Sequence, residues 1–116
     1  MVQMTVELPE ELAARIRPLR AWLPTALELT LVGFRTQAAA TAGEVIRFLS
    51  TEPSPQDILD YHVSAAAQTR LRRLLALNEA GLLGEAEQQE LDELQQIEHI
   101  MVLLKARTEP QERRQS

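Results

Sequence analysis

The sequence predicts a mainly α-helical protein, with a short N-terminal β-strand, several short helices and a C-terminal antiparallel helical hairpin. Of the 116 residues, 19 are Leu and 15 are Ala, whereas four are aromatic. Leu and Ala favour helices, and a β-sandwich would need more Val, Ile, Tyr and Phe. Apolar residues also recur at helical spacing over most of the chain, which is the main sequence signal of amphipathic helices.

The expected strand is the opening segment, residues 2–8, in which apolar and polar residues alternate. One face holds Val2, Met4, Val6 and Leu8, and the other holds Gln3, Thr5 and Glu7. Period two over this length is typical of a half-buried strand. Because a lone strand leaves both edges unpaired, it must pair with a second copy of the chain or with a partner protein. The alternative is a short extended arm packed on the helices.

Two short helices are expected after the strand. The first begins at Pro9, because proline at a first helical position followed by two acids is a start signal. Pro18 kinks or ends this helix. Pro24 then opens a second helix over about residues 25–37, in which Gly33 is a weak point.

Capping motifs divide the middle of the chain. Thr41 and Glu44 have the spacing of a capping box and are expected to start a short helix. Ser54 and Asp57 have the same spacing and are expected to start the next helix. Ser64 is expected to cap the helix that follows.

The C-terminal part is expected to form the hairpin. One helix runs from Ala65 to about Ala80 and ends at Gly81, and a longer one runs from Glu85 to about Arg107. The loop between them is short, so the helices must be antiparallel. The apolar stripe of the longer helix consists of Leu91, Leu94, Ile97, Ile100, Met101 and Leu104.

The two helices of this hairpin differ in length, so the longer one extends beyond the end of the shorter one. At about 1.5 Å per residue, the first spans about 24 Å and the second about 35 Å. The overhang holds residues 101–104, which need cover from the N-terminal half or from another chain. We therefore divide the chain into residues 1–63, a candidate dimerisation region, the hairpin of residues 64–108, and a disordered tail of residues 109–116.

Composition excludes several classes of function. The 12 Lys and Arg against 17 Asp and Glu give a net charge of −5, which disfavours nonspecific binding to nucleic acid or to anionic membranes. Cysteine is absent, so disulfides, thiolate nucleophiles and Cys-ligated zinc are excluded, and a cytoplasmic location is expected. The longest apolar runs fall far short of the roughly 18 residues that a membrane span needs.

Short motifs follow one another along nearly the whole chain: Val6-Glu7-Leu8-Pro9-Glu10-Glu11-Leu12, Leu23-Pro24-x-x-Leu27-Glu28-Leu29, Glu44-Val45-Ile46-x-Phe48-Leu49, Pro53-x-Pro55, Arg70-Leu71-x-x-Leu74-Leu75, Asn78-Glu79-x-Gly81 and Leu104-Lys105-Ala106. In this order they resemble a widespread family of small, poorly characterised bacterial proteins. The resemblance implies a cytoplasmic, antitoxin-like protein without enzymatic activity. No cofactor is expected. One departure is Gly84, where the resemblance leads us to expect a Ser or Thr cap.

The opening of the chain is also similar to the ribbon-helix-helix arrangement of bacterial antitoxins and repressors. In that arrangement two strands pair across a dimer, and their outward side chains read the major groove. The matching positions are Gln3, Thr5 and Glu7. Gln and Thr suit base edges, whereas the carboxylate of Glu7 is repelled by phosphates, and no Lys or Arg occurs in residues 1–14.

Several charged residues invite a chemical interpretation. Glu98 and His99 are adjacent on the last helix, so their side chains diverge by about 100° and cannot converge on one ion. The acidic run of residues 85–93 is either a contact surface for a basic partner or a solvated face. The arginines at positions 70, 72 and 73 either contact phosphate or pair with acids on the facing helix.

The predicted function is therefore a non-enzymatic protein–protein interaction module, antitoxin-like, that binds and masks a partner protein. The partner expected is a nuclease-type toxin, and the chain itself is expected to be a homodimer. The predicted partner-binding residues are Leu94, Ile97, Met101, Val102, Leu103 and Leu104. The alternative is a dimeric DNA-binding regulator that uses Gln3, Thr5 and Glu7.

Overall fold

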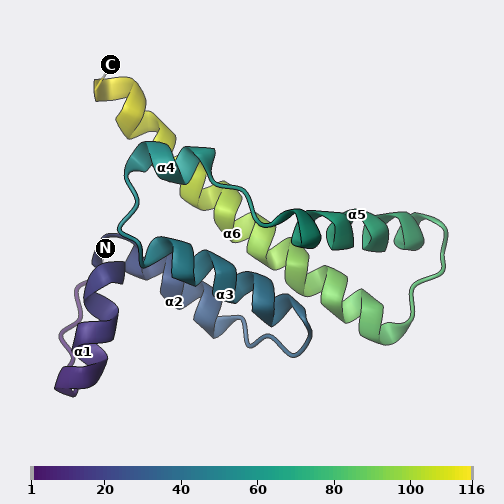
Figure 1. Cartoon of the computed structure of the whole chain (residues 1–116), viewed down its shortest axis with the longest axis horizontal. Coiled ribbons are helices and arrows are strands. Elements are labelled where there is room, and N and C mark those ends of the chain that lie inside the picture. The colour runs from purple at the N-terminus through teal and green to yellow at the C-terminus, as the bar shows by residue number, and fades with distance from the viewer. Residues whose placement is uncertain (1, 116) are drawn as a thin grey trace.

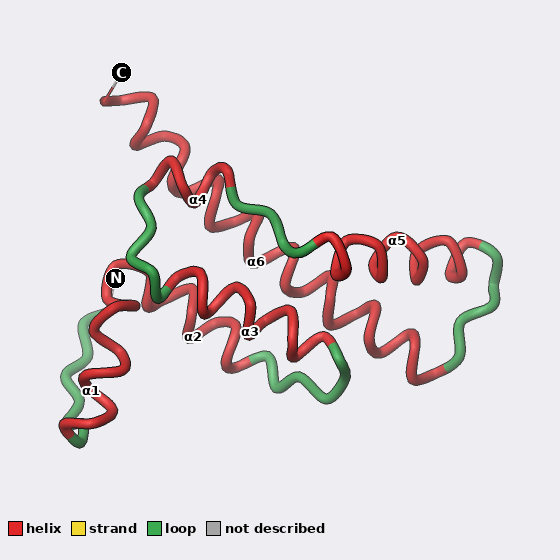
Figure 2. Tube along the Cα trace, in the orientation of Figure 1, coloured by secondary structure: helices red, strands yellow, loops and turns green. Residues whose placement is uncertain are grey.

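The computed structural model describes residues 2–115, with side chains described for residues 2–108. The elements are α1 (Glu10–Ile16), the 3-10 helix η1 (Arg17–Trp22), α2 (Leu23–Leu31), α3 (Ala38–Leu49), α4 (Pro55–Asp60), α5 (Ala65–Glu79) and α6 (Glu85–Gln115). The prediction of a mainly α-helical protein is confirmed (Figures 1 and 2). The side chains of residues 109–116 lie outside the described part of the structure, so the disordered tail expected there stays a prediction.

The predicted N-terminal strand is wrong for this chain by itself. Residues 2–9 have no regular secondary structure, and no strand occurs within residues 2–115. The physical reason is that a strand needs a neighbouring edge to hydrogen-bond, and the described part of the chain offers helices alone. The green trace of this segment runs beside α1 in Figure 2 and leads into it at Pro9.

Helix α6 is the central helix of the fold. It crosses the whole molecule in Figure 1, and α2, α3, α4 and α5 all pack against it. Its apolar stripe is buried as predicted, with exposed fractions of 8% or less at Leu91, Leu94, Ile97, Ile100, Met101 and Leu104. Leu29, Leu49, Ile58 and Leu74 complete the core from the other helices. The N-terminal helices and the hairpin therefore share one hydrophobic core.

The overhang of the longer hairpin helix is covered in part from within the chain. Met101 is 8% and Leu104 is 4% exposed, because the short helix α4 packs against α6 beyond the end of α5. Ile58 of α4 is fully buried in the same core. The N-terminal half of the same chain therefore covers Met101 and Leu104, whereas Val102 and Leu103 stay 56% and 42% exposed.

Three predicted helix boundaries are confirmed by their hydrogen bonds and backbone angles. The Ser54 hydroxyl accepts from the Asp57 backbone N–H at 3.1 Å, and the Asp57 carboxylate accepts from the Ser54 N–H at 3.0 Å. Ser64 caps α5 by accepting from the Ala67 N–H at 3.2 Å. Gly81, with φ of +71°, follows α5 in the left-handed conformation that glycine adopts most easily.

Two boundaries near the α2–α3 loop differ from the prediction. Helix α2 ends at Leu31, not near residue 37, because Gly33 has φ of +72° and turns the chain instead of lying inside a helix. Helix α3 begins at Ala38, before the predicted capping box at Thr41, which is buried inside the helix. The hydroxyl that serves the start of α3 is that of Thr36, which accepts from the Ala38 N–H at 3.1 Å.

Pro18 does not stop the first helical segment but changes its type. The chain continues past Ile16 as the 3-10 helix η1, with Pro18 in its first turn. Leu19 and Trp22 of η1 pack against the core, and the indole N–H of Trp22 donates to the Pro53 carbonyl at 3.1 Å. Through η1 the preceding segment is attached to the body of the protein.

Candidate functional site

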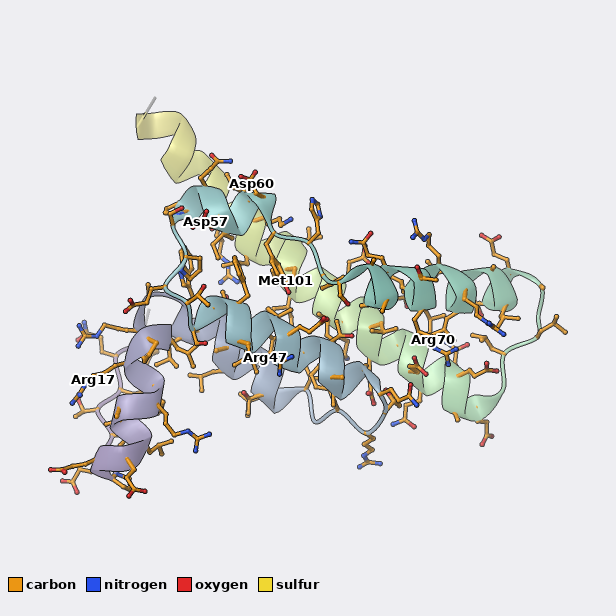
Figure 3. The ribbon with its side chains drawn as sticks, in the orientation of Figure 1. Arg17, Arg47, Asp57, Asp60, Arg70 and Met101 are labelled. Atoms are coloured by element: carbon orange, nitrogen blue, oxygen red, sulfur yellow. The ribbon has the colours of Figure 1, made fainter. Side chains whose placement is uncertain are left out.

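An apolar groove of about 370 Å³ lies between α5, α6 and the linker that joins α4 to α5. Leu94, Ile97 and Met101 of α6 contribute three apolar side chains to its lining, and Met101 lies midway along that helix in Figure 3. Leu71 of α5 and Val63 of the linker contribute two more. The volume is at the lower end of the range for ligand pockets.

The linker side of the groove is held in place by two contacts to Tyr61. The Lys105 ammonium donates to the Tyr61 carbonyl at 2.6 Å, and the Tyr61 ring stacks on Phe48 with centroids 4.1 Å apart. Burial, reinforced by Glu44 and opposed by Arg47, raises the pKa of the Tyr61 phenol. This side of the groove is therefore fixed to both α3 and α6.

Charged side chains also line the groove. Glu98 and Lys105 come from α6, Arg72 from α5 and His62 from the linker. His62, Arg72 and Glu98 are exposed. A groove with an apolar lining and charged residues among its exposed members resembles the core and rim of a protein–protein interface.

The structure brings four of the six predicted partner-binding residues together. Leu94, Ile97, Met101 and Val102 all line the groove, and Val102 is 56% exposed. Leu104 is buried in the core, and Leu103, 42% exposed, lies outside the groove lining. The predicted set is therefore divided by the turn of the helix, because adjacent helical residues point about 100° apart.

The residues on the other side of the groove were not predicted as binding residues from the sequence. Ala67 and Leu71 of α5 line it at a spacing of four residues, and Tyr61 and Val63 reach it from the linker. The spacing of Ala67 and Leu71 indicates that they share a helix face. Which other face they meet depends on how α5 crosses α6.

Glu98 and His99 do not form a joint site. Glu98 lines the groove between α5 and α6, whereas His99 lines a second hollow with Glu28 and Leu31 of α2. This is the divergence that adjacent helical positions predict. Within the described residues, no three His, Cys, Asp or Glu side chains are placed to hold a metal ion.

The acidic run of residues 85–93 is neither a uniform contact surface nor a uniform solvated face. Glu85 and Asp92 are exposed, but Glu90 and Glu93 are each only 7% exposed. Glu90 receives two hydrogen bonds from Arg70 of α5, at 2.8 and 2.9 Å, and Figure 3 shows Arg70 between the two helices. The predicted pairing of the arginine cluster with the facing helix is thus confirmed for Arg70.

Glu93 is bound by the loop before α3. Its carboxylate accepts from the backbone N–H groups of Arg35 and Thr36, at 3.1 Å for the closer contact of each, and from the Thr36 hydroxyl at 2.6 Å. Burial by itself raises the pKa of this carboxyl, but these hydrogen bonds and one from Gln89 outweigh it, so the pKa lies below its ordinary value. Two of the acids that the sequence offered for a partner are therefore used inside the chain.

The residues predicted for DNA reading do not form a reading surface in this chain. Gln3, Thr5 and Glu7 are all exposed, but they lie on a segment without strand structure. The ribbon-helix-helix arrangement requires that segment to be a paired strand.

Comparison with known protein families, with curated proteins and with solved structures finds no match to this chain. No helix in the described residues is both long and apolar enough to cross a membrane.

Proposed function

We propose that this chain is a non-enzymatic interaction module that binds and masks a partner protein through the groove between α5 and α6. The observation that carries the proposal is the groove itself: an apolar lining from Leu94, Ile97 and Met101 beside the exposed apolar side chain of Val102. Grooves of this kind receive the apolar face of an amphipathic helix from a partner. The buried lining residues also belong to the core, so the site is formed in advance.

The partner proposed is a basic protein that inserts one apolar helix face. The net charge of −5 favours association with a positively charged protein over a nucleic acid. The groove itself holds Glu98 together with Arg72 and Lys105, so the acidic surplus that attracts such a partner lies outside the groove, for example at the exposed Glu85 near the start of α6. The class of partner proposed is a small nuclease-type toxin with a basic surface.

This proposal retains the antitoxin-like role that the family resemblance implies. Masking in such a pair is steric, because a bound helix and its surroundings cover the partner's surface. The cytoplasmic location expected from the absence of cysteine belongs to the same proposal.

The test compares two neighbouring exposed residues of α6, of which Val102 lines the groove and Leu103 does not. Val102→Glu places a carboxylate in the groove, and Leu103→Glu places the same group outside its lining. Both side chains are exposed, at 56% and 42%, so neither variant empties the core. Deleting α6 is unsuitable, because α2, α3, α4 and α5 all pack on it.

Each variant is co-expressed with the product of the adjacent reading frame and purified by an affinity tag, and the complex is sized by light scattering. We expect wild type and Leu103→Glu to retain the complex and Val102→Glu to lose it. Absence of any complex with the wild-type chain contradicts the choice of this partner. Equal binding by both variants contradicts the groove as the binding surface.

A further inference from the structure

The N-terminal segment of residues 2–16, called here the N-terminal unit, contributes nothing to the hydrophobic core. It comprises the extended arm of residues 2–9 and helix α1, and none of its described residues is buried. Among the elements, α1 packs chiefly against η1. In Figure 1 it projects from one end of the molecule, away from α5 and most of α6.

The N-terminal unit nevertheless carries much of the exposed apolar surface of the described residues. Val2 is 89% exposed, Met4 83%, Val6 66%, Leu8 41% and Leu12 39%. Single exposed apolar residues are common, but five within eleven consecutive residues form a patch that indicates an interaction site. A seven-residue helix also has little stability by itself in water. Both observations point to cover from outside the chain.

The charges of α1 identify what supplies that cover. Glu10 and Glu11 lie in its first turn, Arg15 in its last turn and Arg17 just after it. All four side chains are exposed, and Arg17 points outward at the edge of the molecule in Figure 3. A helix with acids at one end and arginines at the other is complementary to an antiparallel copy of itself.

We propose that the N-terminal unit is a self-association surface, in which two copies of the chain pair their α1 helices antiparallel about a twofold axis. In that arrangement Glu11 of each copy lies opposite Arg15 of the other on the side of α1 that carries Leu12, so this contact occurs twice. Glu10 and Arg17 lie on the other side of the helix and add attraction over a longer distance. The apolar side chains of the two arms and the two Leu12 residues cover one another between the charged ends.

The overall charge of this region favours a second copy over the basic partner proposed for the groove. The N-terminal unit itself holds three glutamates, at positions 7, 10 and 11, and one arginine, Arg15, and Arg17 and Arg20 of the adjoining η1 make residues 2–20 neutral as a whole. A charge-neutral segment attracts neither a strongly basic nor a strongly acidic protein. The surplus of acids that gives the chain its charge of −5 lies in the rest of the sequence.

The first test measures the mass of the full chain in solution. Light scattering of the wild type is expected to give twice 13.1 kDa. Val6→Asp combined with Leu12→Asp places two carboxylates in the patch without touching the core, and is expected to give a monomer with unchanged helical circular dichroism. Leu31→Asp is the control, because Leu31 is 82% exposed on α2, and it is expected to stay dimeric.

The second test exchanges charges between two variants. Glu10→Arg with Glu11→Arg, and Arg15→Glu with Arg17→Glu, each place like charges opposite one another in their own dimer. Each is expected to dissociate on the order of tenfold more readily than wild type. An equimolar mixture restores opposite charges at both ends, so mixed dimers are expected to form with near wild-type affinity.

A monomeric wild type at micromolar to millimolar concentration overturns the proposal, as does a dimer that survives the Val6 and Leu12 substitutions. Weak dimers of both charge variants without a mixed dimer overturn the antiparallel arrangement. The result is independent of the groove, because Val102→Glu is expected to remain dimeric. Loss of partner binding and loss of the dimer are therefore distinguishable.

Discussion

The Thr36 hydroxyl donates a 2.6 Å hydrogen bond to the carboxylate of Glu93, joining the loop before α3 to the first third of α6. The two residues are 57 positions apart in the sequence. The same hydroxyl accepts from the Ala38 N–H at 3.1 Å, so one side chain binds the first residue of α3 and anchors this end of the helix to α6. The fold therefore depends on a carboxylate that is only 7% exposed.

We expect Glu93→Gln to reduce the free energy of unfolding by about 2 kcal/mol. The amide has one acceptor oxygen in place of two, and its NH₂ group would face the backbone donors of Arg35 and Thr36. Urea unfolding followed by circular dichroism measures the loss. The matched control is Asp92→Asn, at an exposed neighbouring position, with a change within about 0.5 kcal/mol. Equal effects of the two substitutions would show that the Glu93 contacts are not stabilising.

The contribution of Glu93 to stability should depend on pH in a defined direction. Its pKa in the folded protein lies below the ordinary value of 4.5, so the unfolded chain binds the proton more readily. The stabilisation is therefore complete above that ordinary value and is lost as pH falls through the folded pKa. We expect the stability difference between wild type and Glu93→Gln to be larger at about pH 7 than at about pH 3. A difference that grows on acidification would contradict the assigned direction.

Arg70→Ala should destabilise the protein more than Arg72→Ala on the same helix. Removal of Arg70 leaves the Glu90 carboxylate, whose side chain is 9% exposed, without its bidentate partner. The Arg70 side chain is itself 38% exposed, so solvent screening keeps the expected loss to about 1–2 kcal/mol. Arg72 is exposed, and its removal should cost about 0.5 kcal/mol or less. Thermal unfolding of both variants measures the two losses of stability. A larger loss for Arg72→Ala than for Arg70→Ala would refute this ranking.

The two glycines of the α5–α6 loop should respond differently to substitution. Gly81 has φ of +71°, and a Cβ there meets no atom within 4 Å, so Gly81→Ala is expected to cost about 1 kcal/mol from backbone strain alone. Gly84 directly precedes α6. Because serine is a slightly better helix cap than glycine, Gly84→Ser is expected to leave the free energy of unfolding unchanged or to raise it by about 0.3 kcal/mol. Chemical denaturation measures both. Stabilisation by Gly81→Ala would mean that this backbone conformation is not maintained in solution.

The sequence by itself determined the helical class, the caps at Ser54 and Ser64, the stop at Gly81 and the buried stripe of α6. These features depend on residues up to four positions apart, whose side chains meet on one turn of helix whatever the rest of the chain does. The order of charges along α1, with acids first and arginines last, is local in the same sense.

The tertiary structure alone decided which acids are buried, which of the predicted partner-binding residues line the groove, and whether the N-terminal segment forms a strand. Glu93 is buried because a loop 57 residues earlier meets α6, and Met101 is covered because α4 reaches past the end of α5. Val102 and Leu103 differ because α5 and the linker border one side of α6. Residues 2–8 alternate as a strand does, but strand formation requires an edge that the described part of the chain does not provide. Contacts between distant segments depend on how helices cross, and no local spacing encodes that.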